Sequence, residues 1–109
     1  MYYIFKIATI GGEVKMEMYE TINKLAIAYN DVMWNKFANC FHKVEIQDNI
    51  LVQIPADIVN VLVHILGYEE TKNWVLKKIS YLDNQSVIEL VKNEKGIKAV
   101  KMFVLSMPN

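Results

Sequence analysis

The segment from Pro55 to Gly67 constrains the fold of this chain more than any other. Proline is favoured in the first turn of a helix, where its missing N–H would have no partner, and glycine is favoured just past a helix end. The residues between them, 56–66, are apolar on almost every side. A helix of this kind needs cover from other elements, so we expect it at the centre of the fold. Its narrow polar strip consists of Asp57, Asn60 and His64.

The residues after this central helix predict three further short helices. Acidic residues at the start and lysines at the end of the stretch 69–78 suit the two ends of a helix dipole. Ser86 and Glu89 have the S-x-x-E spacing of a capping box, which indicates a helix start. A last helix is expected over 94–107, with an apolar face and a lysine face, before Pro108. The lysines of that face are Lys95, Lys98 and Lys101.

The first part of the chain has two different periodicities. Residues 2–19 are rich in aromatic and β-branched types, with a glycine pair at 11–12 that suits a tight turn, and we expect a β-hairpin there. Residues 20–41 follow the helical spacing i, i+3, i+4, i+7 instead. This stretch predicts one long amphipathic helix, with a break near Asn30 and Asp31 as the alternative.

Residues 43–54 alternate between polar and apolar types around the turn pair Asp48–Asn49. This pattern favours a second short hairpin, and the alternative is an irregular connector whose apolar residues cover the helices. The expected fold is therefore α+β and mainly helical. We expect one domain, with a mixed half over 1–53 and a helical half over 54–107.

Charge composition argues against direct reading of nucleic acid. The chain has 109 residues, with 12 Lys and Arg residues balancing 12 Asp and Glu residues, and every one of those cations is lysine. The sequence contains no arginine, the residue whose planar guanidinium group usually makes the bidentate hydrogen bonds to base edges and phosphates. We therefore expect no autonomous nucleic-acid binding.

Cysteine usage and hydropathy favour a cytoplasmic protein. A single cysteine, Cys40, excludes an internal disulfide framework and fits a reducing compartment. The first ten residues lack the pattern of a signal peptide. The longest apolar stretch, 58–66, is less than half of the roughly 20 residues that a membrane helix needs. We expect no membrane association.

Motifs for catalysis are missing from the sequence. It contains no glycine-rich phosphate loop, no G-x-S-x-G and no H-E-x-x-H, so we expect a protein that is not an enzyme and uses no cofactor or metal. Cys40 and His42 are the one candidate pair of nucleophile and base, and a buried cysteine beside a surface histidine is the simpler interpretation. A zinc site that adds His64 would still need a fourth ligand.

Three groups of side chains are candidates for binding. The polar strip of the central helix is a possible interface, or simply the solvated side of that helix. The lysine row of the last helix suits an acidic partner, or is a solvated face. Trp34 and Trp74 are expected in the core, and either one would be an interface anchor if it lay at the surface.

The helical half resembles the toxin-binding domain of Xre/MbcA/ParS-type bacterial antitoxins. The residues that match in order and approximate spacing are Trp74, Leu82, Ser86, Glu89, Leu90, Gly96 and Val100. Val87 stands where the family usually has proline, and Asn84 replaces a loop glycine. The family's usual tail of glycine and aromatic residues has no counterpart before Asn109.

This resemblance implies an antitoxin-like module that neutralises a toxin of the NAD-consuming RES type by steric occlusion. The two C-terminal helices would form the docking surface, in a homodimer or a hetero-complex. The partner-binding residues implied are Trp74, Lys98, Lys101, Phe103, Met107 and Asn109. The alternative is a small phage or mobile-element protein that inhibits a host defence enzyme or another host protein. In that case the N-terminal hairpin and the strip of the central helix would carry the interface.

Overall fold

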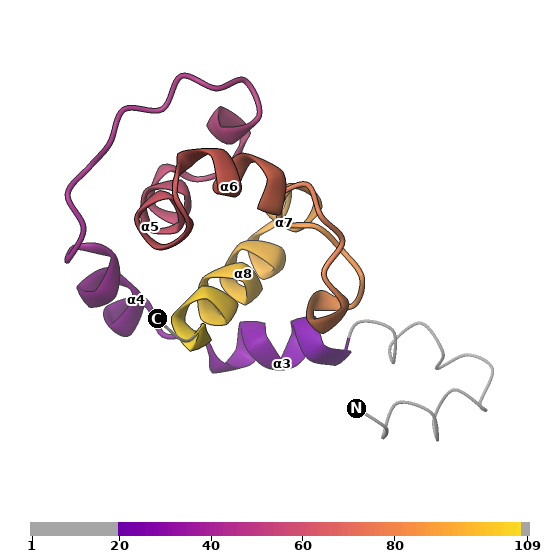
Figure 1. Ribbon diagram of the computed structural model, residues 1–109. Helices are drawn as coiled ribbons and strands as arrows, with labels where there is room; N and C mark the ends of the chain where they lie inside the picture. The colour runs from indigo at the N-terminus through magenta and orange to yellow at the C-terminus, as the bar shows by residue number, and fades with distance from the viewer. Residues whose placement is uncertain (1–19, 108–109) are drawn as a thin grey trace.

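The structure is a computed structural model that describes residues 20–107. The hairpin expected over 2–19 and the candidate binding residue Asn109 lie outside the described residues. Helices are labelled as in Figure 1, with η for the short 3₁₀ helices. In chain order they are α3 (Glu20–Ala28), α4 (Asp31–Ala38), η2 (Leu51–Gln53), α5 (Ala56–Leu66), α6 (Tyr68–Trp74), η3 (Ser80–Leu82), α7 (Val87–Leu90) and α8 (Glu94–Ser106).

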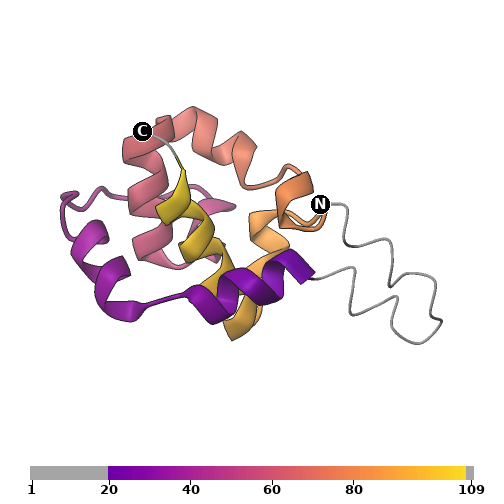
Figure 2. The ribbon, with the colours of Figure 1, turned by 90° about the horizontal axis from the view of Figure 1, so that it is seen from below.

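Helices α5 and α8 lie in the middle of the fold, and the other elements surround them (Figure 1). Helix α3 packs along α8, and α4 contacts both α5 and α8. Figure 2 shows α3 crossing α8 on the side opposite to α6. The expectation that 56–66 forms a central helix is confirmed, since Ile58, Val61 and Leu62 are fully buried. In the described part of the chain, no helix is long and apolar enough to cross a membrane.

The expected α+β class is wrong for the described residues, which are helical and contain no strand. One isolated antiparallel bridge, between Ile79 and Gln85, is the only β-type pairing in residues 20–107. The hairpin predicted over 43–54 is replaced by the alternative, an irregular connector followed by η2. The reason is local: Asp48 Oδ1 accepts the N–H groups of Ile50 and Leu51 at 2.8 and 3.1 Å. These bonds start a helical turn, and the same two bonds lower the pKa of Asp48.

The single long helix predicted over 20–41 is also wrong, and the alternative break is confirmed. Helix α3 ends at Ala28 and α4 begins at Asp31. Asn30 between them has an extended backbone, and its Oδ1 accepts the N–H of Met33 at 3.0 Å. This side chain caps a new helix, which is why the helical pattern of the sequence does not continue as one rod.

The helix starts predicted in the second half are confirmed by their caps. Ser86 and Glu89 form the capping box, in which the Ser86 N–H donates to Glu89 Oε1 at 2.9 Å and the Glu89 N–H donates to Ser86 Oγ at 3.3 Å. Asn93 caps α8 by accepting the N–H of Gly96 at 2.8 Å. Gly67 ends α5 with a φ of 92°, a conformation that favours glycine. The helix predicted over 69–78 is shorter than expected and ends at Trp74.

Candidate functional site

Asp57, from the polar strip, joins three helices. Its Oδ2 accepts a hydrogen bond from the indole Nε1–H of Trp34 at 2.8 Å, and Lys101 Nζ lies 3.4 Å from the same oxygen. The Lys101 ammonium also lies 5.6 Å from the ring centroids of Tyr29 and Trp34, within the range of a cation–π contact. Trp34 is fully buried, as expected for a core tryptophan. Asp57 therefore ties α4 and α8 to α5.

Tyr29 lies at the edge of this group, and its surroundings raise the pKa of its phenol. Burial raises the pKa of the Tyr29 phenol, and the carboxylates of Asp31 and Asp57 raise it further. The ring of Tyr29 presents its face to the ammonium of Lys101, which lies 5.6 Å from the ring centroid.

Asn60, also from the strip, holds the irregular connector 41–48 against α5. Its Oδ1 accepts the N–H of Val44 at 2.8 Å. Its Nδ2 donates to the carbonyl oxygen of His42 at 3.0 Å and to that of Phe41 at 3.4 Å. One amide side chain therefore pairs with three backbone groups of a segment that has no helix of its own.

Replacing Asn60 with leucine is expected to lower the free energy of unfolding by about 1–3 kcal/mol. The apolar side chain leaves the partly buried N–H of Val44 without an acceptor, and an unmade bond of this kind is expensive. Urea denaturation measures the loss, and amide hydrogen exchange locates it, because the Val44 amide is expected to exchange faster. The matched control is Asn73→Leu, at an exposed position of α6. An unchanged exchange rate at Val44 in the Asn60 variant contradicts the prediction.

His64 completes the strip beside the start of the connector. Its Nδ1 lies 2.9 Å from the carbonyl oxygen of Asn60 in the preceding turn of α5. Its ring lies 5.2 Å from that of Phe41 and 4.8 Å from that of His42, measured between centroids. All three side chains of the strip are half-buried and bonded within the chain. The structure thus brings them together under the connector and α4, with few free polar atoms left for a partner.

The candidate nucleophile Cys40 does not meet a base. It is exposed, which corrects the expectation of a buried cysteine, and its Sγ donates to the carbonyl oxygen of Lys36 at 3.4 Å. His42 instead packs edge-on against His64. Across residues 20–107, no group of three or more histidine, cysteine, aspartate or glutamate side chains could hold a metal ion.

The lysine row of α8 does not form one surface. Lys95 donates a hydrogen bond to Asn23 Oδ1 of α3, and Lys98 is exposed. Lys101 is turned inward to Asp57, with a side chain only 17% exposed. The first two lysines border a shallow groove of about 770 Å³ between α3 and α8, next to the 85% exposed Ile27.

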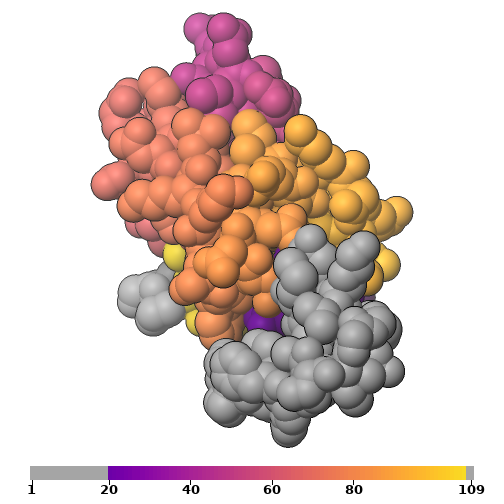
Figure 3. All heavy atoms as spheres, turned by 90° about the vertical axis from the view of Figure 1, so that its right-hand side faces the viewer, coloured from indigo at the N-terminus to yellow at the C-terminus, as the bar shows by residue number. Residues whose placement is uncertain are grey.

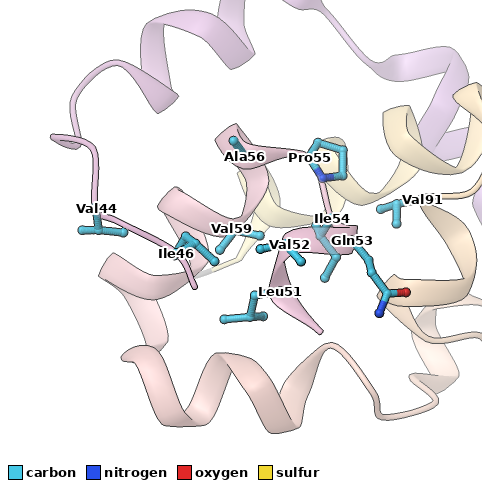
Figure 4. A pocket seen from close by; sticks show the side chains of 10 residues that line it. All are labelled: Val44, Ile46, Leu51, Val52, Gln53, Ile54, Pro55, Ala56, Val59 and Val91. Atoms are coloured by element: carbon cyan, nitrogen blue, oxygen red, sulfur yellow. The ribbon is translucent and has the colours of Figure 1, made fainter. Parts of the chain in front are cut away.

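A second groove, of about 630 Å³, opens beneath the connector (Figure 4). Its lining includes Val44 and Ile46 of the connector, Val52 of η2, Ile54 directly after η2, and Val59 of α5. The lining is aliphatic apart from one amide side chain, so it offers no acid, base or nucleophile. It can take part in packing or binding, but its side chains supply no catalytic chemistry.

Three aromatic side chains, Trp74, Phe103 and Tyr81, gather where α6, η3 and α8 meet. We call them the aromatic patch. The rings of Trp74 and Phe103 are stacked at 6.2 Å with an interplanar angle of 6°, and the ring of Tyr81 lies 5.5 Å from that of Phe103. Trp74 and Phe103 are half-buried, while Tyr81 is 55% exposed. The segments that carry Trp74 and Tyr81 lie on the face seen in Figure 3.

Of the implied partner-binding residues, the structure brings Trp74 and Phe103 into contact. Met107 follows Phe103 by about one turn and is half-buried against the core. Tyr81 is the member of the patch that the sequence analysis missed. Its only local signal in the sequence is an aromatic residue directly before Leu82.

No family model, curated protein or solved structure matches the chain.

Proposed function

We propose that this chain is a non-enzymatic protein-binding module, similar to the toxin-binding domain of Xre/MbcA/ParS-type antitoxins, that neutralises a partner enzyme by covering its surface. The observation that carries this proposal is the aromatic patch, in which Tyr81 is 55% exposed over the stacked pair Trp74 and Phe103. Aromatic side chains held rigidly at a surface supply a large contact area at low entropic cost, and they are enriched among the residues that dominate binding energy.

Trp74 belongs both to the resemblance and to the patch, and the other residues that carry the resemblance shape the elements next to it. Leu82 is fully buried directly after Tyr81. The capping box of Ser86 and Glu89 sets the start of α7, and Gly96 lets α8 approach α7 closely. Leu82, Ser86, Glu89 and Gly96 thus set the positions of η3, α7 and α8, and η3 and α8 carry two of the three rings of the patch. A docking surface on the C-terminal helices fits this arrangement.

The strip of α5 is a weaker candidate for the interface. Asp57 and Asn60 already make their bonds to Trp34, Lys101 and the connector. A partner that used these atoms would have to break those bonds first, and each bond is worth about 0.5–3 kcal/mol. This favours the patch over the strip, both for a toxin and for a host enzyme as the partner.

Tyr81→Glu is expected to weaken partner binding by about 30-fold or more, because it places an unpaired carboxylate in the centre of an apolar contact. The partner is first captured with the tagged chain from lysate of its own host and identified by mass spectrometry. Calorimetry with the purified partner then measures Kd for each variant. The control is Ile27→Glu, which adds the same charge at a more exposed apolar position outside the patch.

An antitoxin-like role is supported if the partner is an enzyme that is toxic when expressed alone and is inactive in the complex. If the captured partner is a host protein of defence or replication, the target of the module is that host protein and not a toxin. Binding that survives Tyr81→Glu but is lost in Ile27→Glu contradicts the proposed surface. An unaltered enzyme activity in a saturated complex contradicts neutralisation.

A further inference from the structure

The connector 41–48 has the alternating exposure of an extended strand, although no other strand pairs with it in residues 20–107. Residues 42–48 form no helix or turn, and exposure alternates along them: Val44 and Ile46 are half-buried, whereas Lys43, Glu45 and Gln47 are exposed. Gln47 Nε2 donates to Glu45 Oε2 at 3.3 Å, so the side chains of these two residues lie on the same face. A period of two is the signature of an extended strand.

Two backbone groups on the inner edge of this segment are already paired. In an extended backbone the C=O of one residue and the N–H two residues on point to the same side. Asn60 uses both groups at once, since its amide donates to the His42 carbonyl and accepts the Val44 N–H. The side chain takes the place that a peptide group of a neighbouring strand would occupy. On the edge that faces α5, the His42 C=O and the Val44 N–H are therefore occupied.

The outer edge of the strand is open. The backbone groups of Lys43 and Glu45 point away from Asn60 by the same alternation, and within residues 20–107 they have no hydrogen-bond partner. Figure 1 shows the connector as an open arc along the rim of the molecule, with no helix beyond it. An exposed row of N–H and C=O groups is a template for pairing with another strand.

We propose that this edge pairs antiparallel with the same edge of a second copy of the chain, about a two-fold axis at Val44. In this register, Val44 lies opposite Val44 of the second copy. Lys43 of each copy lies opposite Glu45 of the other copy, so this pair occurs twice. Both are the residues whose backbone groups face outward, so they form the hydrogen-bonded pairs of the ladder. Opposite charges at such positions stabilise strand pairing.

Charge selects this register over its neighbour. A two-fold axis at Glu45 would place Glu45 opposite itself and Lys43 opposite Gln47, which exchanges two attractive pairs for one repulsion. A shift of the register by a single residue is excluded by the pleat of the strands. It would place the half-buried side chains of one copy on the same side of the ribbon as the exposed side chains of the other. The proposal is independent of the partner proposed above, because the connector and the aromatic patch share no residue.

The test is the oligomeric state of the full chain with Lys43→Glu, Glu45→Lys and the double variant that exchanges the two charges. Sedimentation velocity over a concentration series measures the dimer dissociation constant. Each single variant is expected to weaken the dimer by about tenfold or more, since both cross-strand pairs become repulsive. The double variant is expected to recover most of the lost affinity, and Lys92→Glu, at an exposed position outside the connector, serves as the charge control.

Amide hydrogen exchange provides a second readout on the unaltered chain. The amides of Lys43 and Glu45 are expected to gain protection as the chain concentration rises, while Val44 is protected throughout by Asn60. A chain that stays monomeric at every concentration overturns the proposal. So does a dimer that all three variants form equally well, or a double variant that fails to restore it.

Discussion

Replacement of Gly96 by alanine is expected to lower the free energy of unfolding by about 3 kcal/mol or more. A Cβ at this position would lie 1.8 Å from the carbonyl oxygen of Leu90 and 2.7 Å from its carbonyl carbon. These atoms are backbone, so no side chain can turn aside to make room. Helices α7 and α8 would have to separate, and the buried residues Val100 and Val104 of α8 would move with them.

Helix propensity acts in the opposite direction and is too small to decide the outcome. Alanine is favoured over glycine inside a helix by about 1 kcal/mol. Urea denaturation of Gly96→Ala gives the net effect, and Lys98→Ala in the same helix, at an exposed position, is the control expected to stay within about 0.5 kcal/mol of the unaltered chain. A Gly96→Ala variant as stable as the unaltered chain would mean that α7 and α8 do not approach this closely.

Replacement of Trp34 by alanine is expected to lower the free energy of unfolding by about 3–5 kcal/mol. The side chain is fully buried, so its removal leaves a large cavity between α4, α5 and α8. It also takes away the indole N–H that donates to Asp57 and the ring face that the Lys101 ammonium covers. Thermal and urea unfolding measure the loss.

Two further variants divide this loss into packing and polar contributions. Trp34→Phe keeps most of the buried ring and removes the N–H donor, so about 1–2 kcal/mol is expected. Met33→Ala, one residue earlier and 61% exposed, is the control and is expected to change stability little. If Trp34→Phe proves as destabilising as Trp34→Ala, the hydrogen bond to Asp57 carries the effect and the cavity argument is wrong.

Elements whose signals are local agree with the sequence analysis. The central helix α5 has its predicted bounds, because a proline start, an apolar periodicity and a glycine end all lie within thirteen consecutive residues. The starts of α7 and α8 are likewise set by hydrogen bonds between groups three residues apart, from Ser86 to Glu89 and from Asn93 to Gly96. In each case the hydrogen-bonding groups are neighbours along the chain.

The strand-like pattern of 43–47 misled the prediction for a physical reason. Alternation of polar and apolar residues reports a surface that is covered on one face, and it does not report whether a second strand is present. The face is covered by α5, and the pairing is supplied by Asn60. The Asn60 side chain, sixteen residues from Val44, makes the hydrogen bonds that a neighbouring strand would make. No local sequence pattern predicts such a long-range pairing.

The candidate site shows the same division. Trp74 and Phe103 were expected to bind a partner, and the structure adds Tyr81 to them through contact between η3 and α8. Conversely, Lys101 was grouped with Lys95 and Lys98 because of helical spacing, whereas its ammonium lies against Asp57. Spacing along one helix predicts the direction in which a side chain points, but it does not predict which charged group of another helix lies next to that side chain.

The sequence by itself determined where α5, α7 and α8 begin, because helix starts depend on groups within one or two turns of each other. Only the tertiary structure decided which groups the polar side chains bond to. The Asp57 carboxylate contacts Trp34 and Lys101, and Asp83 Oδ2 accepts the N–H of Ile22 in the first turn of α3 at 3.0 Å. A polar atom is satisfied by water or by protein, and burial by distant segments decides which of the two it finds.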